Sequence, residues 1–186
     1  MTRTEAAARH AAYADRFATL IDGVVDWSAP TPVKEWTARD VVGHLIDWFP
    51  GFLAMGSDVR LPDGPEVADD PANAWRVRSA ALQAILDDPA ERTFSSQMFP
   101  DMPLAMAIDQ FYSTDIFMHA WDLARASGQD ASWDEATCAG LLAGLESMAE
   151  VIRASGQYGD QQPVADDAPV QDRLLAFIGR DPHWRP

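Results

Sequence analysis

Three residues with metal-binding side chains share one predicted helical face with apolar neighbours. Asp115 and His119 are four positions apart in a helical run predicted over about 104–127, so they lie on the same side of it. Asp122 follows one turn later. A buried carboxylate or imidazole without a partner is strongly destabilising. A divalent cation could compensate this polar row, and so could a hydrogen-bonded network or a solvated groove.

A third candidate ligand lies on another predicted helix. Apolar residues recur at helical spacing over about 38–55, and His44 interrupts this stripe. His44, Asp115 and His119 would together supply two imidazole nitrogens and one carboxylate. Three protein ligands with an open coordination position are typical of catalytic metal sites. Zinc is the first metal that this donor set suggests, and nickel and iron also suit it.

An open coordination position allows two kinds of enzyme. A bound water whose pKa falls to about 7 would make the protein a metal-dependent hydrolase. A coordinated thiol would lose its proton and could attack an electrophile. A third alternative, from another class, is a non-catalytic binding or stress-associated module in which the same side chains form a polar network. The sequence identifies no catalytic residue beyond the candidate ligands.

Two further carboxylates lie close to the candidate ligands in the sequence. Asp122 could orient His119. We expect it instead to cap the helix or to pair with Arg125. Asp47, one turn beyond His44, could hold that imidazole, but we expect a solvent-exposed position.

Four other residues receive structural interpretations. His10 and His183 lie near the two ends of the sequence and are expected to be solvated. The single cysteine, Cys138, is expected to be a small core residue. Trp48 could line a pocket at the site, but aromatic residues at helical spacing are more often part of a core.

Periodicity predicts the elements that must position these side chains. Thr37 followed by Asp40 resembles a capping box at the start of the second helix. The segment 93–103 contains two prolines and is expected to lack regular structure. No credible set of strands is present, so we predict an all-α fold. The helices are predicted at about 3–25, 38–55, 72–86, 104–127, 133–154 and 170–178.

The composition is typical of a globular protein. With 186 residues and 47% hydrophobic content, the chain fits a single domain over 1–186. Its formal net charge of −15 argues against nucleic acid or an anionic membrane as partner, since each requires a basic surface. We see neither a signal peptide nor an apolar run of about 18 residues, so the expected compartment is the cytoplasm.

Three stretches of the sequence resemble a known family. They are WTARDVVGHL at 36–45, HAWDLARA at 119–126 and DAPVQDRLLAFIGRDP at 167–182. Their order and spacing resemble the DinB-like superfamily, and more narrowly the metal-binding proteins related to the N-terminal domain of mycothiol-dependent maleylpyruvate isomerase. The resemblance implies a four-helix bundle with long crossover connections and a short C-terminal helix. It also implies a divalent metal at the positions of His44, Asp115 and His119, where family members commonly have His or Glu in place of Asp115.

The resemblance further implies a class of reaction. In the wider superfamily the metal activates the thiol of mycothiol or bacillithiol, and we therefore expect a metal- and thiol-dependent transferase with mycothiol as co-substrate and a small electrophilic substrate. A hydrolase, or a non-catalytic module with a degenerate metal site, are the alternatives. The full isomerase has an additional C-terminal domain that contributes to its active site. Because this sequence leaves no room for one, we expect another reaction. A homodimer is a family-level expectation.

Overall fold

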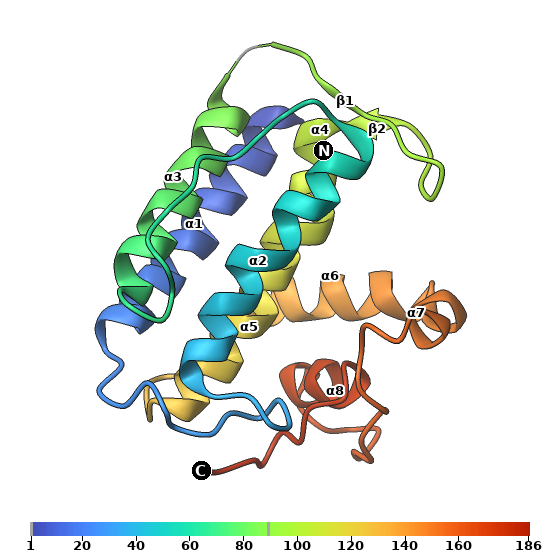
Figure 1. Cartoon of the computed structure of the whole chain (residues 1–186). Helices are drawn as coiled ribbons and strands as arrows, with labels where there is room; N and C mark the ends of the chain where they lie inside the picture. The colour runs from blue at the N-terminus through green and yellow to red at the C-terminus, as the bar shows by residue number, and fades with distance from the viewer. Residues whose placement is uncertain (1, 89) are drawn as a thin grey trace.

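The computed structural model describes residues 2–88 and 90–186, and helices dominate it (Figure 1). The all-α prediction is confirmed. The first part of the chain contains α1 (Arg3–Asp22), α2 (Ala38–Gly56), α3 (Pro71–Asp87) and a continuous helical run of α4 (Leu104–Ala107), η1 (Ile108–Ser113) and α5 (Thr114–Ala126). The second part contains α6 (Glu135–Glu146), α7 (Ala149–Ser155) and α8 (Val170–Phe177).

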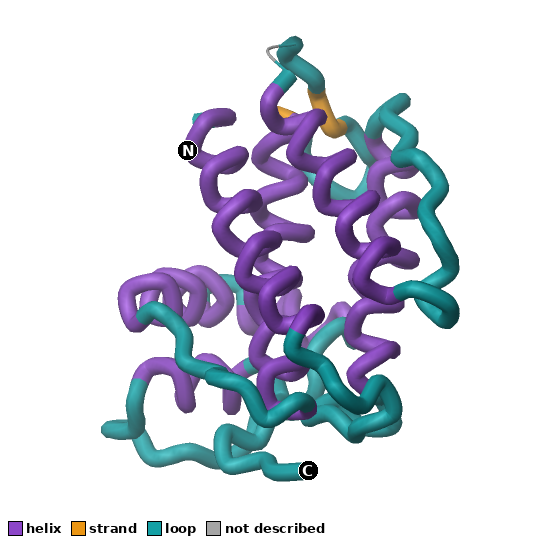
Figure 2. Tube along the Cα trace, turned by 90° about the vertical axis from the view of Figure 1, so that its left-hand side faces the viewer, coloured by secondary structure: helices purple, strands orange, loops and turns teal. Residues whose placement is uncertain are grey.

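Four long helical segments form a bundle, which Figure 2 shows from the side. The helix α1 packs against α3 and α5, and α2 packs against the same two helices. The cyclic order is therefore α1, α3, α2 and α5, with a long connection over 57–70 between α2 and α3. Within the described residues, no helix combines the length and the apolar character that a membrane span requires.

Two apolar clusters hold the helices together. The first fills the bundle and takes buried side chains from α1, α2, α3 and the α4–η1–α5 run. The second lies where α6 and α8 pack on each other, and it includes side chains from one face of α5. Phe117, Met118 and Trp121 of α5 belong to this second cluster, together with the buried Cys138 of α6. The opposite faces of α5 therefore support different parts of the molecule.

The helix α2 begins at the predicted capping box. The Asp40 amide donates to Thr37 Oγ1 at 3.4 Å, and the Thr37 amide donates to Asp40 Oδ2 at 2.7 Å. The preceding loop is tied to the same turn, because the Ala38 amide donates to the Ala29 carbonyl at 2.9 Å. These bonds fix the position of Trp36, directly before the cap.

The helical run that carries Asp115 changes its winding just before that residue. The segment η1 is a π-helix, and the Thr114 amide donates to the carbonyl of Asp109, five residues earlier. Tyr112 of η1 is fully buried and donates its hydroxyl to the Leu45 carbonyl at 2.9 Å, next to His44. Single π turns recur at functional sites because they shift the direction of the following side chains.

Three details of the predicted elements are wrong. The helix expected over 3–25 ends at Asp22, where the Gly23 amide caps it by donating to the Leu20 and Ile21 carbonyls. The helix expected over 133–154 is divided into α6 and α7. The Ser147 amide still donates to the Ala143 carbonyl at 3.2 Å, but the Met148 amide donates to the Leu145 carbonyl, three residues back, and the α-helical ladder stops there. The segment 93–103 is not entirely irregular. It forms a short antiparallel pair of β1 (Thr93–Phe94) and β2 (Met102–Pro103), stabilised as Phe94 packs in the bundle core.

Substitution of Gly179 by Ala is expected to destabilise the protein by about 1–3 kcal/mol. Gly179 has φ = 87°, and a Cβ there would lie 2.6 Å from the backbone of Gly159. Thermal unfolding measures the loss. Gly144→Ala is the matched control, since this helical position has open space around it and Ala should stabilise it by about 0.5–1 kcal/mol. Equal effects at the two positions would contradict the requirement for glycine at 179.

Candidate metal centre

The three predicted ligands meet between α2 and α5. His44 Nε2 is 3.1 Å from Asp115 Oδ2, and His119 Nε2 is 3.4 Å from Asp115 Oδ1. One ligand atom from each side chain lies within 4.8 Å of the others. Two donors of one tetrahedral zinc ion, with bonds of about 2.0–2.1 Å, lie about 3.3 Å apart. Each imidazole is therefore spaced from Asp115 as a second ligand of the same ion would be.

The site opens to solvent on one side. The side chain of His44 is 29% exposed, that of Asp115 is 16% exposed and that of His119 is 7% exposed. The indole N–H of Trp48 donates to Asp115 Oδ2 at 3.0 Å. Trp48 lies on α2, four residues beyond His44, and its bond holds the carboxylate of Asp115 in one orientation. Both interpretations of Trp48 therefore hold in part, because the half-buried ring packs against the bundle core and also supports a candidate ligand.

Trp36 covers the two imidazoles. Its ring lies 4.9 Å from that of His44 and stacks on that of His119 at 5.6 Å with an interplanar angle of 20°. The preceding residue, Glu35, has φ = 67°, a left-handed conformation that non-glycine residues rarely adopt. Locally unfavourable backbone thus precedes the aromatic cover, and the capping box that follows holds it in place.

Asp122 is bound to His119 and to Arg180, so the expectation of a cap or an Arg125 pair is wrong. Asp122 is fully buried, and its Oδ2 lies 2.9 Å from His119 Nδ1. Arg180 donates from Nε to Oδ1 at 3.0 Å and from Nη2 to Oδ2 at 2.9 Å. Arg125 instead donates to the Trp184 carbonyl. The physical reason is that a buried carboxylate needs a charged partner, and Arg180 provides the positive charge.

The electrostatics of this pair are mutually stabilising. Burial acts to raise the pKa of Asp122, but the Arg180 guanidinium and the hydrogen bond with His119 outweigh it, so the pKa lies below its ordinary value. Burial acts to lower the pKa of Arg180, and Asp122 reverses that effect. Asp122 is consequently a carboxylate that can only accept hydrogen bonds.

The ionised Asp122 determines which nitrogen of His119 carries a proton. Since Oδ2 of Asp122 can only accept, Nδ1 of His119 donates this hydrogen bond, and Nε2 is the ring nitrogen left to face Asp115. This Nε2 lies 3.4 Å from Asp115 Oδ1. A proton on Nε2 or a metal ion between the two atoms would satisfy both.

Other sequence-predicted residues lie elsewhere. Asp47 and His183 are exposed, as expected, and Cys138 is buried. Asp47 lines a cavity of about 230 Å³ together with Arg78, and His44 is not among the lining residues. His10 is fully buried in the bundle, so its predicted solvation is wrong. The apolar periodicity of α1 brings His10 to face η1, which its distance from the chain end could not reveal.

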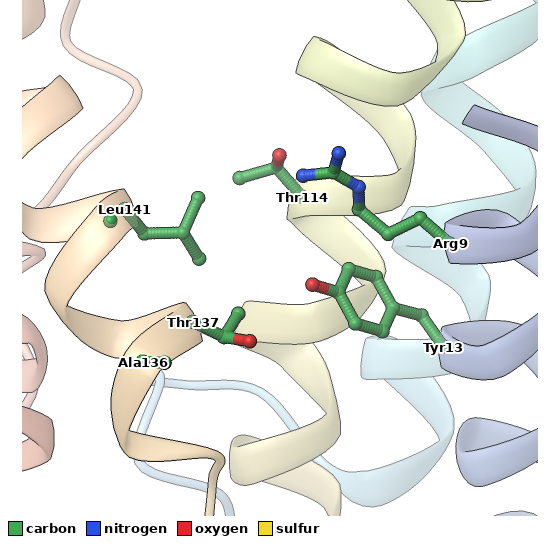
Figure 3. Close-up of a pocket in the computed structure, with 7 residues that line it drawn as sticks. Arg9, Tyr13, Thr114, Ala136, Thr137 and Leu141 are labelled. Atoms are coloured by element: carbon green, nitrogen blue, oxygen red, sulfur yellow. The ribbon is translucent and has the colours of Figure 1, made fainter. Parts of the chain in front are cut away.

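A larger cavity of about 600 Å³ lies between α1, α5 and α6, as Figure 3 shows. Its walls combine the Arg9 guanidinium, hydroxyl groups and the apolar side chain of Leu141. Arg9 also pairs with the buried Asp109 of η1 at 3.1 Å. His44, Asp115 and His119 do not line this cavity, so it is separate from the candidate metal centre. The lining residues are Arg9, Tyr13, Thr114, Ala136, Thr137, Gly140 and Leu141.

Comparison with known proteins identifies the family of this chain. The mycothiol maleylpyruvate isomerase N-terminal domain matches residues 9–124, a range that contains all three candidate ligands. The chain belongs to this family. Its resemblance to DinB-like bundles, first suggested by the motifs, is thereby confirmed.

Two relatives from this comparison are the uncharacterized proteins MT0763 and Rv0738 of Mycobacterium tuberculosis, strains CDC 1551 and H37Rv. Each is 29% identical over 175 residues, which cover 89% of this chain and 92% of the relative. No solved structure matches the chain. The similarity to these relatives thus continues well beyond the family's own match, into the C-terminal part.

Two residues at the site were not assigned a role from the sequence. Trp36 and Arg180 both belong to stretches that carry the family resemblance, but nothing in their spacing relates them to the ligands. For Arg180 one signal was available, namely that the carboxylate of Asp122, if buried, would need a cation. For Trp36 the position depends on the loop before α2, which periodicity does not describe.

Proposed function

We propose that this protein binds one divalent metal ion through His44, Asp115 and His119 and acts as a thiol-dependent transferase with mycothiol as co-substrate. The observation that carries the proposal is the convergence of three ligand side chains, with Asp115 Oδ1 3.4 Å from His119 Nε2 and Asp115 Oδ2 3.1 Å from His44 Nε2. The hydrogen bond from His119 Nδ1 to Asp122 directs Nε2 of the same ring toward Asp115. Membership of the mycothiol maleylpyruvate isomerase N-terminal family supports mycothiol as the thiol.

The chain's own residues divide the work of such a site. The three ligands hold the ion, Asp122 and Trp48 orient His119 and Asp115, and Trp36 excludes water from one side. A bound divalent ion would supply Lewis acidity, which ionises a thiol placed at the open position. The exposed side of His44 provides that approach. Zinc is the first choice for this set of two imidazoles and one carboxylate, and nickel and iron also bind such ligands.

Calorimetric titration with mycothiol tests the proposal. We expect binding to the zinc-loaded protein and none to the chelated protein or to a zinc-treated His44→Ala variant. S-methylated mycothiol, a thioether that has no S–H proton to lose, is the matched control and should bind much more weakly to the loaded protein. Equal binding of mycothiol to the loaded and chelated forms would defeat the thiol assignment. Turnover of esters or amides without any thiol would favour the metal-dependent hydrolase instead.

A second candidate function is a non-catalytic module without metal. The observation in its favour is that Asp115 Oδ2 already accepts from the Trp48 indole and lies 3.1 Å from His44 Nε2. A proton on His119 Nε2 would then complete a closed network. This candidate predicts a protein whose thermal stability is the same with zinc and with chelator, whereas a ligand that binds only the folded protein raises it.

A further inference from the structure

The C-terminal segment, residues 157–186, lies beyond the family match at 9–124 and reaches the candidate metal centre. In Figure 1 the chain after α8 returns toward the base of the bundle. Arg180 there contacts both oxygens of Asp122 at 2.9–3.0 Å, and one of these oxygens lies 2.9 Å from His119 Nδ1. Two successive charge-assisted contacts, from Arg180 to Asp122 and from Asp122 to His119, therefore connect the C-terminal segment to a candidate ligand.

The backbone of Arg180 is also held in position, by a hydrogen bond at the end of α8. The Arg180 amide donates to the Leu175 carbonyl at 2.8 Å, which closes the end of α8 after the left-handed Gly179. Its side chain is only 14% exposed. The planar guanidinium presents two parallel N–H groups to the carboxylate, so it sets the plane of Asp122 as well as its charge. That plane directs Oδ2 toward the imidazole.

We propose that Arg180 is a positioning residue for the metal centre, and that docking of the C-terminal segment and metal binding are coupled through Asp122 and His119. This inference rests on the proposed metal site and adds Arg180, a residue of the C-terminal segment, to the groups that support it. If Arg180 fixes the Asp122 plane, metal affinity depends on it without direct contact. By linkage, the metal must then favour the docked segment by the same factor.

Metal affinity of arginine variants tests the first part. Competition with a zinc chelator should show Arg180→Ala binding zinc about 10- to 100-fold more weakly than wild type. Arg153→Ala is the matched control, because Arg153 holds the same segment through the Phe177 and Gly159 carbonyls and does not contact Asp122. Arg180→Lys retains the charge without the planar fork and should give an intermediate affinity. A loss in Arg153→Ala as large as in Arg180→Ala would reduce Arg180 to a general anchor and overturn the proposal.

A metal-free readout separates this inference from the proposed function. Nitrogen-15 NMR of chelated wild-type protein should show the His119 proton on Nδ1, and Arg180→Ala should shift the population toward Nε2–H. Arg180→Lys, which keeps the buried ion pair, guards against a variant that fails to fold. An unchanged tautomer in both Arg180 variants would overturn the positioning role. A wild-type protein that binds no zinc but shows the tautomer shift would defeat the metal proposal alone.

Limited proteolysis tests the coupling. Zinc should slow cleavage of the exposed connection over 157–169 in the wild type and in Arg153→Ala, but not in Arg180→Ala, where the contact between segment and site is removed. Cleavage of the wild type at the same rate with zinc and with chelator would contradict the coupling. So would equal protection of all three proteins.

Discussion

Asp115→Asn is expected to lower the affinity for zinc by more than about 100-fold and to leave the fold intact. Asn has nearly the same shape as Asp and can still accept the Trp48 indole N–H, which in the wild type lies 3.0 Å from Asp115 Oδ2. It lacks the negative charge that a divalent ion and two neutral imidazoles require. Equilibrium dialysis followed by elemental analysis measures the change, and circular dichroism verifies the fold.

Asp47→Asn is the matched control for this substitution. Asp47 lies on α2 one turn beyond His44 and is exposed, so the same loss of charge should leave zinc affinity unchanged. His44→Ala should lose affinity as Asp115→Asn does, because each removes one of three ligands. Retention of one zinc equivalent by Asp115→Asn, with wild-type affinity, would exclude Asp115 as a ligand.

The second large effect concerns His10 and the stability of the bundle at acid pH. The ring is fully buried, with Nδ1 3.3 Å from Ser113 Oγ and Nε2 without a well-formed hydrogen bond in the described structure. Burial lowers the pKa of His10 from 6.5 to about 4, and the Ser79 backbone opposes this only in part. The folded protein therefore keeps the ring neutral where the unfolded chain protonates it.

The sign of the pH effect follows from this difference. As pH falls below 6.5 the unfolded state takes up a proton that the folded state does not, so the free energy of unfolding decreases until pH about 4. One pKa unit corresponds to about 1.4 kcal/mol, and the loss attributable to His10 should reach about 3 kcal/mol. We expect His10→Leu to lack this portion of the loss in urea unfolding at pH 7 and pH 4.

The comparison is made within each variant, so any constant cost of poor packing by leucine cancels. His183→Ala is the control, because His183 is exposed and should leave the wild-type pH dependence unchanged. The same loss of stability between pH 7 and pH 4 in His10→Leu and the wild type would show that His10 is not neutral in the folded protein.

Local patterns in the sequence predicted the elements and the candidate ligands for a physical reason. The helices follow from apolar residues at a period of 3.6, and the start of α2 follows from a cap made by Thr37 and Asp40 within one turn. Asp115 and His119 lie four residues apart on one helix, so their proximity is also a local property. His44 was linked to them because all three interrupt apolar stripes.

The supporting contacts of the site could not be predicted in the same way. Arg180 is 58 residues from Asp122, and its approach depends on how α8 ends and how the chain turns afterwards. Burial of His10 depends on α1 facing η1, 103 residues away at Ser113. Neither relation leaves a periodic signal. In both cases the requirement that a buried polar group find a partner was the available guide.

The most direct test of the account is a crystal structure of the zinc-loaded protein, with anomalous diffraction recorded on both sides of the zinc absorption edge. We predict one anomalous peak between α2 and α5, about 2.0–2.2 Å from His44 Nε2, an Asp115 carboxylate oxygen and His119 Nε2. His119 Nδ1 should remain bonded to Asp122. Zinc-soaked crystals with no peak at these three side chains, or with a peak only at other residues, would contradict the proposed metal centre.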